Sequence, residues 1–203
     1  MATASSAVRS TAGVILAGGA SSRFGGNKAL ALLEGRPLIA HVADVLASVF
    51  TELLLITNTP ESYRFLGWPM AADIRPGQGP LAGIQAALRA MATDQACVVA
   101  CDMPRIRADL LTLLAGQPGN WDVALPWLAS GPEPLCAVYR KSCLPVIDDQ
   151  LGKGQGAIHL ALNQLCLRRL TAAEIVPLCG ELSLLRNINR QEDLHALLPA
   201  EGD

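Results

Sequence analysis

The sequence predicts an α/β fold, a mostly parallel β-sheet with helices on both faces. Hydrophobic runs of strand length alternate with helix-like segments along the chain. The central runs are apolar throughout, which is typical of parallel strands buried on both faces. The order strand, helix, strand, helix favours right-handed crossovers and an open, doubly wound sheet. Ligands of such sheets bind beyond the carboxyl ends of the strands, so function is expected in the loops that follow them.

The first helix is expected over Pro37–Phe50, between two strand-like runs. Its apolar residues recur at three- and four-residue spacing from Leu38 to Val49, as a helix with one buried stripe requires. Pro37 suits the first helical turn, where a missing N–H costs nothing. The predicted strands of the sheet are Gly13–Ala17, Glu52–Thr57, Cys97–Cys101 and Val123–Pro126.

A second helix is expected over Pro80–Met91, because Pro80 stands at its start and apolar residues again share one face. Two further helices are predicted at Ala108–Leu114 and Ala157–Leu165. The segment 127–136, WLASGPEPLC, is interpreted as a long functional loop.

The chain is expected to form a single domain, because 203 residues suffice for one well-buried core. Residues 1–12 are small and polar and are predicted to be a disordered tail, which leaves 13–203 as the domain. We found no internal repeat and no linker that would divide it.

Composition excludes several functional classes. Hydrophobic residues make up 51% of the chain, which argues against disorder, and no apolar run approaches the roughly 20 residues that cross a bilayer. The net charge of −2 gives no basic footprint for polymeric nucleic acid. The six cysteines contain no CxxC pair and are expected to be reduced and mostly buried. A cytoplasmic protein without membrane partners is therefore expected.

The loop after the first predicted strand, GGASSRFGGNK, has the composition of a phosphate cradle. It lacks the GxGxxG spacing of dinucleotide-binding proteins, and it lacks the GKS or GKT ending of a P-loop. Its glycines could nevertheless let backbone N–H groups converge on an anion, while Arg23 and Lys28 offset the charge of several phosphates. A triphosphate fits this pattern, although a tight surface turn with two solvated cations would have the same sequence.

A second candidate group is Asp102, which follows the strand-like run CVVAC. A carboxylate at this strand end would face the glycine loop and could hold Mg²⁺ between itself and a nucleotide. The alternative is an aspartate that caps a helix near Arg107.

Five segments in order, LAGGASSRFGGNK, GPLAGI, CDMP, PLCAVYR and NIN, resemble the nucleotidyltransferases that make molybdopterin dinucleotide cofactors. The resemblance extends from Gly13 to about Leu198. It implies a Rossmann-like nucleotide-diphospho-sugar transferase fold. It also implies an activity, the Mg²⁺-dependent transfer of GMP from GTP to the phosphate of molybdenum-molybdopterin, with release of pyrophosphate.

The resemblance also implies site residues. Arg23 and Lys28 would lie by the phosphates, and Asp102 would be the magnesium ligand, so these three carry catalysis. The implied nucleotide-binding set is Leu16, Ala17, Gly18, Gly19, Lys28, Asn58, Asp73, Gly83 and Asp102. On local sequence alone, Asn58 could instead cap a helix and Asp73 could be a turn residue.

For the pterin substrate the resemblance points to Asn187 and Asn189. Asn189 followed by Glu192 would also make a capping-box-like helix start. Lys153, in the loop GKGQG, could meet a second anion such as the molybdopterin phosphate, or could belong to a flexible turn. Trp127 could stack on a pterin or simply anchor its loop.

Two departures and two rival functions accompany this interpretation. Phe24 and Asn27 replace the Met and Asp that the family usually has, which puts the orientation of Lys28 in question. A cytidylyltransferase of the same family is one rival, but LAGG and Pro80 favour guanine. A non-catalytic carrier of nucleotide or pterin is the other. A delivery contact with a molybdoenzyme or a chaperone is compatible with either role.

Overall fold

A single central sheet organises the computed structural model, which describes residues 7–18 and 26–195. The strand order is β10-β7-β9-β6-β1-β4-β5, and β8 pairs with β7 at the side. The strands of this sheet are β1 (Thr11–Leu16), β4 (Leu53–Ile56), β5 (Met70–Ala71), β6 (Gln95–Ala100), β7 (Val123–Leu128), β8 (Gly131–Pro132), β9 (Cys136–Arg140) and β10 (Leu167–Leu170).

The middle of the sheet is parallel, as predicted. Strand β1 pairs in parallel with β4 on one side and with β6 on the other, so Val14 lies opposite both Leu54 and Val98. Every residue of β1 and of β6 is buried. The continuous apolar pattern of these strands therefore reflects helices on both faces.

Strand β9 departs from the predicted topology. It lies between β6 and β7 and runs antiparallel to both. The parallel β10 at the sheet edge was not predicted either. Its four residues include two arginines, so the segment lacks the apolar run that marks a buried strand.

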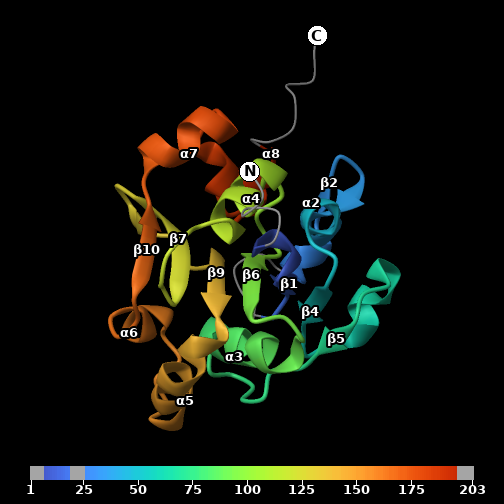
Figure 1. Cartoon of the computed structure of the whole chain (residues 1–203). Coiled ribbons are helices and arrows are strands. Elements are labelled where there is room, and N and C mark those ends of the chain that lie inside the picture. The colour runs from blue at the N-terminus through green and yellow to red at the C-terminus, as the bar shows by residue number, and fades with distance from the viewer. Residues whose placement is uncertain (1–6, 19–25, 196–203) are drawn as a thin grey trace.

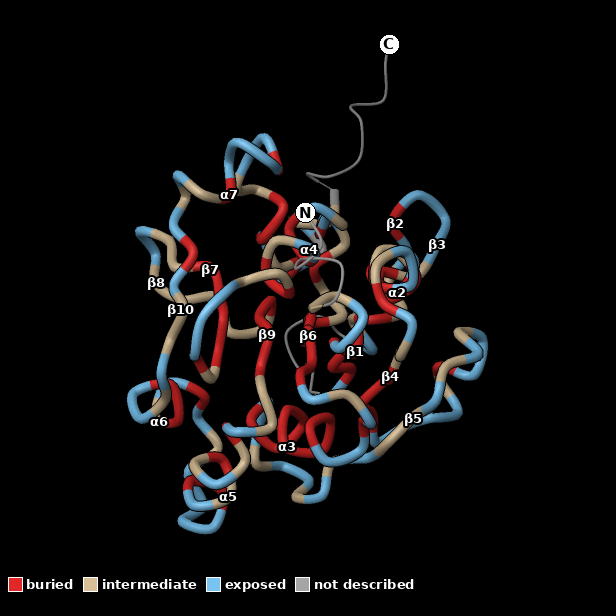
Figure 2. The backbone as a smooth tube through the Cα atoms, viewed as in Figure 1, coloured by how far each residue is buried: buried red, intermediate tan, exposed pale blue. Residues whose placement is uncertain are grey.

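The helices cover the two faces in two groups (Figure 1). The residue bounds are α2 (Leu38–Val49), α3 (Pro80–Ala90), α4 (Ala108–Ala115), α5 (Leu144–Gly152), α6 (Ile158–Leu162), α7 (Ala172–Cys179) and α8 (Gln191–His195). Helices α2, α4 and α7 enclose one hydrophobic core with the sheet, and α3, α5 and α6 enclose the other. Figure 2 shows the sheet strands buried between these layers.

The predicted helices largely agree with these bounds, but α6 ends at Leu162, three residues earlier than expected. Helices α5 and α7 were not predicted. A small hairpin of β2 (Leu32–Leu33) and β3 (Arg36–Pro37) leads from the glycine loop into α2.

The predicted tail is wrong for residues 7–12. Residues 7–9 are helical, and Thr11 and Ala12 belong to the buried strand β1. The Thr11 hydroxyl donates to the Ala7 carbonyl (2.7 Å) and accepts from the Gln95 side-chain amide (2.9 Å). Small polar residues are thus ordered here because their hydrogen bonds are satisfied inside the fold. Residues 1–6 lie outside the described part of the chain.

The predicted loop 127–136 is partly regular. Strand β7 continues to Leu128, and Trp127 pairs with Pro132 of β8 in an antiparallel turn. The segment therefore forms a short hairpin before the chain enters β9.

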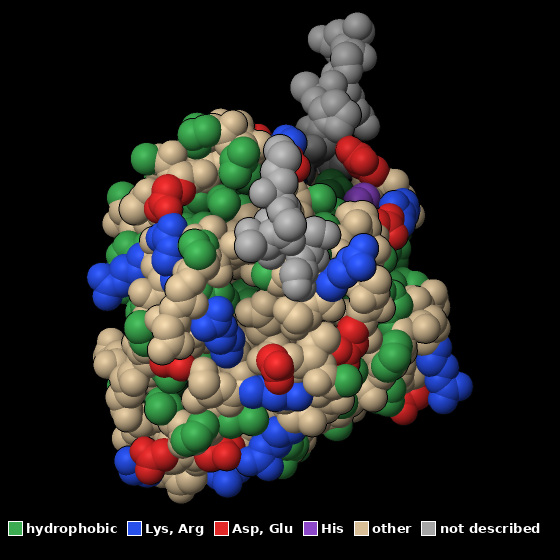
Figure 3. All heavy atoms as spheres, in the orientation of Figure 1, with side chains coloured by type: hydrophobic (Ala, Val, Ile, Leu, Met, Phe, Trp, Pro, Cys, Tyr) green, Lys and Arg blue, Asp and Glu red, His purple; other side chains and the backbone are tan. Residues whose placement is uncertain are grey.

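The surface carries charges of both signs. On the face in Figure 3, basic and acidic side chains are interspersed. No helix in the described ranges has the length and apolar character required to cross a bilayer.

Close packing around β1 gives a first prediction. A Cβ at Gly13 would lie 2.8 Å from Phe50 Cδ2 and 3.2 Å from Leu46 Cδ2. We expect Gly13→Ala to lower the free energy of unfolding by about 1–3 kcal/mol, because the core must shift to admit the methyl group. Urea denaturation measures this change.

The matched control is Gly152→Ala at the end of α5, where an added Cβ meets no atom within 4 Å. The free energy of unfolding of this variant should equal that of the parent or exceed it by up to about 1 kcal/mol. Equal stability of the two variants would contradict the packing around β1.

Candidate active site

The site begins where β1 and β6 end side by side. Leu16 pairs with Ala100, so Gly18 and Asp102 follow at equivalent places on the carboxyl edge of the sheet. The amide of Cys101 donates to the Leu16 carbonyl (3.2 Å), which ties the two strand ends together. Gly19 and Arg23 lie outside the described residues.

Lys28 and Asp102 form a mostly buried ion pair at this edge. Lys28 Nζ is 2.6 Å from Asp102 Oδ2 and 3.0 Å from Asn189 Oδ1. The two charged side chains are only 12% and 18% exposed. The predicted phosphate-binding lysine, the predicted metal ligand and one predicted pterin residue thus meet in one cluster.

Asn27 positions Lys28. It is the N-cap of the 3-10 turn Lys28–Leu30, and its Oδ1 accepts from the Ala29 amide (3.2 Å). Asn27 Nδ2 also donates to the Tyr63 hydroxyl (2.9 Å). Burial raises the pKa of Tyr63, so the phenol stays protonated. Because asparagine supplies the same capping oxygen as aspartate, the departure at residue 27 leaves the local turn intact.

Two side-chain oxygens of the predicted site residues are buried without a hydrogen-bond partner in the described part of the chain. Asp102 Oδ1 and Asn187 Oδ1 are buried, and neither is hydrogen-bonded to a described residue. Carboxylate and amide oxygens are suitable ligands for Mg²⁺, which is commonly held by one or two carboxylates together with substrate phosphates. No three His, Cys, Asp or Glu side chains gather as a metal cluster within the described ranges. The residues therefore fit Mg²⁺ that shares its coordination with a nucleotide.

The NIN segment is fixed by its backbone. The Ile188 amide donates to the Asp102 carbonyl (3.0 Å), and the buried Ile188 packs with Leu33 and Leu38. This contact brings Asn187 and Asn189 beside the end of β6.

The alternative capping roles are not observed. Asp193, rather than Glu192, accepts from the amides of Asn189 and Arg190 (2.9 Å each), which leaves the Asn189 side chain to Lys28. Helix α4 has Arg107 at its N-cap, so Asp102 does not cap it.

The predicted nucleoside residues also converge. Asn58 Nδ2 donates to Asp73 Oδ2 (3.1 Å), and the Asp73 amide donates back to Asn58 Oδ1 (3.0 Å). A Cβ at Gly83 would lie 3.4 Å from Asp73 Oδ1 and 3.3 Å from a Leu16 methyl, and one at Gly18 would lie 3.8 Å from Asp73 Oδ2. Asn58 caps nothing here, because the next 3-10 helix has Thr59 at its N-cap.

Beside this group lies a cavity of about 320 Å³, large enough for part of a nucleotide. The residues that line it are Ala17, Gly18, Gly26, Asn27, Asn58, Thr59 and Tyr63. Sequence reasoning missed Tyr63 because a lone tyrosine in a polar segment carries no chemical signature. Its role follows from the contact with Asn27.

Two predicted pterin residues are not part of this cluster. Lys153 Nζ pairs with Asp149 Oδ2 (2.5 Å) on its own helix and is more than half exposed. Trp127 stands on β7 with the guanidinium of Arg169 over its ring. The last residue of the GKGQG loop, Gly156, packs closely against the backbone of Gln78. A Cβ at Gly156 would lie 1.7 Å from the Gln78 carbonyl oxygen, so no side chain fits there.

The pKa values of two neighbouring side chains, Cys101 and Glu133, are raised. Burial and the charge of Asp102 raise the pKa of Cys101 to about 12, so this thiol stays neutral. Burial raises the pKa of Glu133, and the negative charge of Asp102 raises it further. Glu133 precedes β9 and was not a predicted site residue. All six cysteines are free thiols, and Cys166 alone among them is exposed.

The fold and the site define the class of the protein: an α/β nucleotidyltransferase, with a glycine loop and a lysine–aspartate pair at the carboxyl edge of its sheet. The family model described as the MobA-like NTP transferase domain matches residues 13–170. The chain belongs to this family.

Relatives of named function support the same class. The chain is 39% identical over 186 residues to the molybdenum cofactor guanylyltransferase of Desulfosudis oleivorans, covering 90% of this chain and 91% of the relative. It is 40% identical over 188 residues to a probable molybdenum cofactor guanylyltransferase of Deinococcus radiodurans, covering 90% and 91%. The crystal structure of molybdopterin-guanine dinucleotide biosynthesis protein A from Archaeoglobus fulgidus matches with a TM-score of 0.81 at 26% identity, covering 91% and 95%.

The buried ion pair gives a second prediction. In a double-mutant cycle of Lys28→Met and Asp102→Asn without ligand, we expect a coupling free energy of about 1–3 kcal/mol, because each single variant leaves a buried polar group poorly paired. The control cycle uses Arg36→Met and Asp44→Asn, whose side chains are 52% and 64% exposed. Its coupling should stay below about 1 kcal/mol. Equal coupling in the two cycles would contradict the buried pair.

The contact at Gly156 gives a third prediction. Gly156→Ala should lower the free energy of unfolding by about 1–3 kcal/mol or more, because the clash is with rigid backbone. It should also weaken nucleotide binding, because Gln78 leads directly into Gly79 at the N-cap of α3. Nucleotide affinity equal to that of Gly152→Ala would show that the loop contact does not support the site.

Proposed function

We propose that the protein transfers GMP from GTP to the phosphate of molybdenum-molybdopterin and releases pyrophosphate. The observation that carries this proposal is the meeting of Lys28, Asp102 and Asn189 beside the group formed by Asn58, Asp73 and Gly83. The functions for which the relatives are named support GTP and molybdopterin as the substrates.

In the proposed reaction a phosphate oxygen of molybdopterin attacks the α-phosphorus of GTP. A new P–O bond forms, and the bond between the α-phosphorus and the bridging oxygen of the leaving pyrophosphate breaks. The nucleophile is already anionic, so the reaction requires no general base. The protein contributes orientation and charge neutralisation, which are large terms in such transfers.

Each residue then has a defined task. Lys28, and Arg23 in the undescribed loop, neutralise the triphosphate together with backbone amides of Gly18 and Gly19. Asn58, Asp73 and Gly83, together with Leu16 and Ala17, bind the nucleoside. Asn187 and Asn189 orient the phosphate end of the pterin substrate.

Mg²⁺ is the proposed cofactor. Asp102, assisted by Asn187, would hold it, as their unpaired buried oxygens allow. Bound there, the ion would supply Lewis-acid charge neutralisation of the triphosphate. Because Asp102 Oδ2 is bonded to Lys28 in this structure, the same carboxylate connects the phosphate-binding lysine with the metal site. We further propose that the reaction takes place in the cytoplasm and that the product passes to a molybdoenzyme or a chaperone.

The test combines binding with transfer. Thermal unfolding is followed with GTP, CTP, ATP and UTP, each with and without Mg²⁺. We expect stabilisation by GTP with Mg²⁺, about 2.7 kcal/mol at 100 times the dissociation constant. Pyrophosphate release is then measured with molybdopterin. A preference for CTP would favour the cytidylyltransferase, and GTP binding without pyrophosphate release would favour a carrier.

Asp102→Asn is the informative variant for catalysis. It should lower kcat roughly 100-fold or more, because it removes the carboxylate charge that would hold Mg²⁺ against the reacting phosphates. The matched control is Asp109→Asn in α4, whose carboxylate pairs with the exposed Arg107. Near-normal turnover by Asp102→Asn at saturating Mg²⁺ would overturn the metal role.

A further inference from the structure

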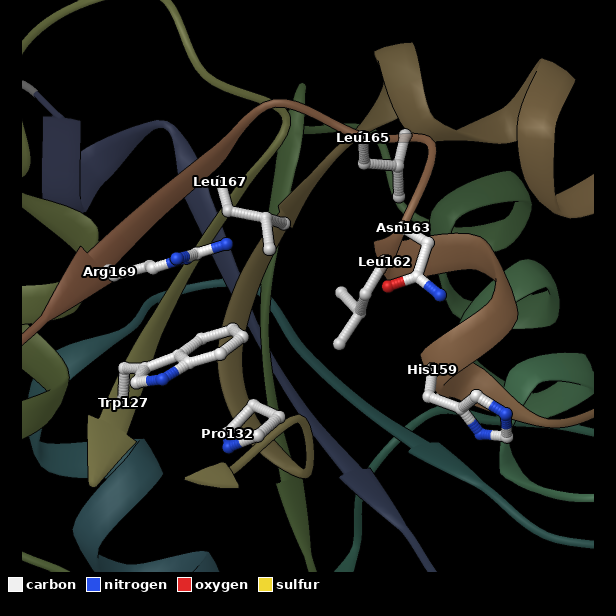
Figure 4. A pocket seen from close by; sticks show the side chains of 8 residues that line it. All are labelled: Trp127, Pro132, His159, Leu162, Asn163, Leu165, Leu167 and Arg169. Atoms are coloured by element: carbon white, nitrogen blue, oxygen red, sulfur yellow. The ribbon is translucent and has the colours of Figure 1, made fainter. Parts of the chain in front are cut away.

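A second cavity of about 290 Å³ lies between the sheet edge and α6. Figure 4 shows Trp127 and Arg169 on one side, and His159, Leu162 and Asn163 on the other. Trp127 comes from the end of β7 and Arg169 from β10. Among the described residues, none of those predicted to bind the nucleotide lines this cavity.

The wall formed by Arg169 and Trp127 is a flat cationic surface. The Arg169 guanidinium carbon lies 4.0 Å from the centroid of the Trp127 ring. Within the described ranges, the Arg169 side chain makes no hydrogen bond and no ion pair, whereas the neighbouring Arg168 pairs with Glu174. An exposed guanidinium that is stacked but not hydrogen-bonded keeps its planar donors available to a ligand.

The opposite wall supplies complementary chemistry. The exposed Asn163 amide offers a donor and an acceptor side by side, while Leu162 provides an apolar surface. The volume lies at the lower end of the range for ligand pockets, which suits one bicyclic heterocycle better than a whole dinucleotide. A flat ring with an aminopyrimidinone edge could lie along the guanidinium and bond Asn163.

Trp127 and Arg169 lie near the carboxyl ends of their strands, at the same edge of the sheet as the candidate active site. Since β9 is antiparallel to both β6 and β7, strands β6, β7 and β10 share one direction, and their carboxyl ends lie together. Strand β10, which carries Arg169, lies three positions from β6, about 14 Å across the sheet. Helix α6 also begins two residues after Gly156, which contacts the Gln78 backbone ahead of α3.

We propose that this cavity binds the pterin ring of the second substrate, with Arg169 stacking on the ring and Asn163 hydrogen-bonding to its aminopyrimidinone edge. This assignment rests on the proposed function. The phosphate of the substrate then points along the sheet edge toward Lys28 and Asp102. Trp127 holds the guanidinium flat rather than contacting the pterin face itself.

The experiment uses pterin-6-carboxylate, a fluorescent aminopyrimidinone, as the probe. It is titrated into the full chain in the presence of Mg²⁺ and a non-hydrolysable GTP analogue. We expect Arg169→Ala and Asn163→Ala each to weaken probe binding at least tenfold. The matched controls Arg64→Ala and Gln164→Ala remove exposed side chains that do not line the cavity, and they should bind the probe like the parent.

Two further measurements separate the charge of Arg169 from its planar stacking surface, and a specific loss of probe binding from misfolding. Arg169→Lys keeps the charge but loses the planar surface, so it should bind the probe more weakly than the parent, and binding equal to the parent would overturn the stacking role. Thermal stabilisation by the GTP analogue should be the same in the parent, Arg169→Ala and Asn163→Ala, which shows that these variants are folded and that their nucleotide site is intact.

The outcomes distinguish this inference from the proposed function. Probe binding that is unaffected by Arg169→Ala and Asn163→Ala, or undetectable in a parent that binds the GTP analogue, overturns the cavity assignment and leaves guanylyl transfer standing. Probe binding that depends on Arg169 in a protein that binds no GTP supports the cavity assignment and overturns guanylyl transfer.

Discussion

The parallel pairing of β1 with both β4 and β6 is the constraint on which the site depends. These three strands are hydrogen-bonded side by side and end together, so the segments after them meet without any further adjustment. The same burial that makes most of β1 apolar also prevents it from shifting, because one residue of slippage would break the register on both sides. Gly18, Asn58 and Asp102 are positioned by this sheet rather than by their own local structure.

Electrostatics at the edge are balanced before any ligand arrives. Lys28 neutralises Asp102, and Asn189 shares the ammonium group, so a mostly buried charge pair is tolerated. The pair leaves one Asp102 oxygen and one Asn187 oxygen without partners, which is costly in a folded protein and is typical of a position prepared for a ligand. A triphosphate and a divalent cation would satisfy both sides of this cluster at once.

The antiparallel strand β9 divides the carboxyl edge into two parts. On one side lie β6, β1 and β4 with the predicted nucleotide residues, and on the other lie β7 and β10 with the cavity beside Trp127 and Arg169. A reaction that joins two large substrates requires two such regions that share one edge, with the reacting phosphates between them. The contact of Gly156 with Gln78 connects the segments that lead into α6 and α3, two helices on the same face of the sheet.

The sequence by itself determined the fold class and the amphipathic helices α2, α3 and α4, and it predicted that Lys28 and Asp102 lie close together at the carboxyl edge of the sheet. Local sequence patterns predict these features: apolar periodicity, glycines beside cations, and a carboxylate at a strand end. It did not determine strands β9 and β10, because their pairing depends on partners far along the chain. Nor did it determine that residues 7–12 are ordered, because this depends on the hydrogen bond from the Gln95 side chain to Thr11. Only the tertiary structure decided that Asn189, 161 residues beyond Lys28, shares its ammonium group, and that Arg169 lies on Trp127. Such contacts join side chains that are distant in sequence, so no local spacing can encode them.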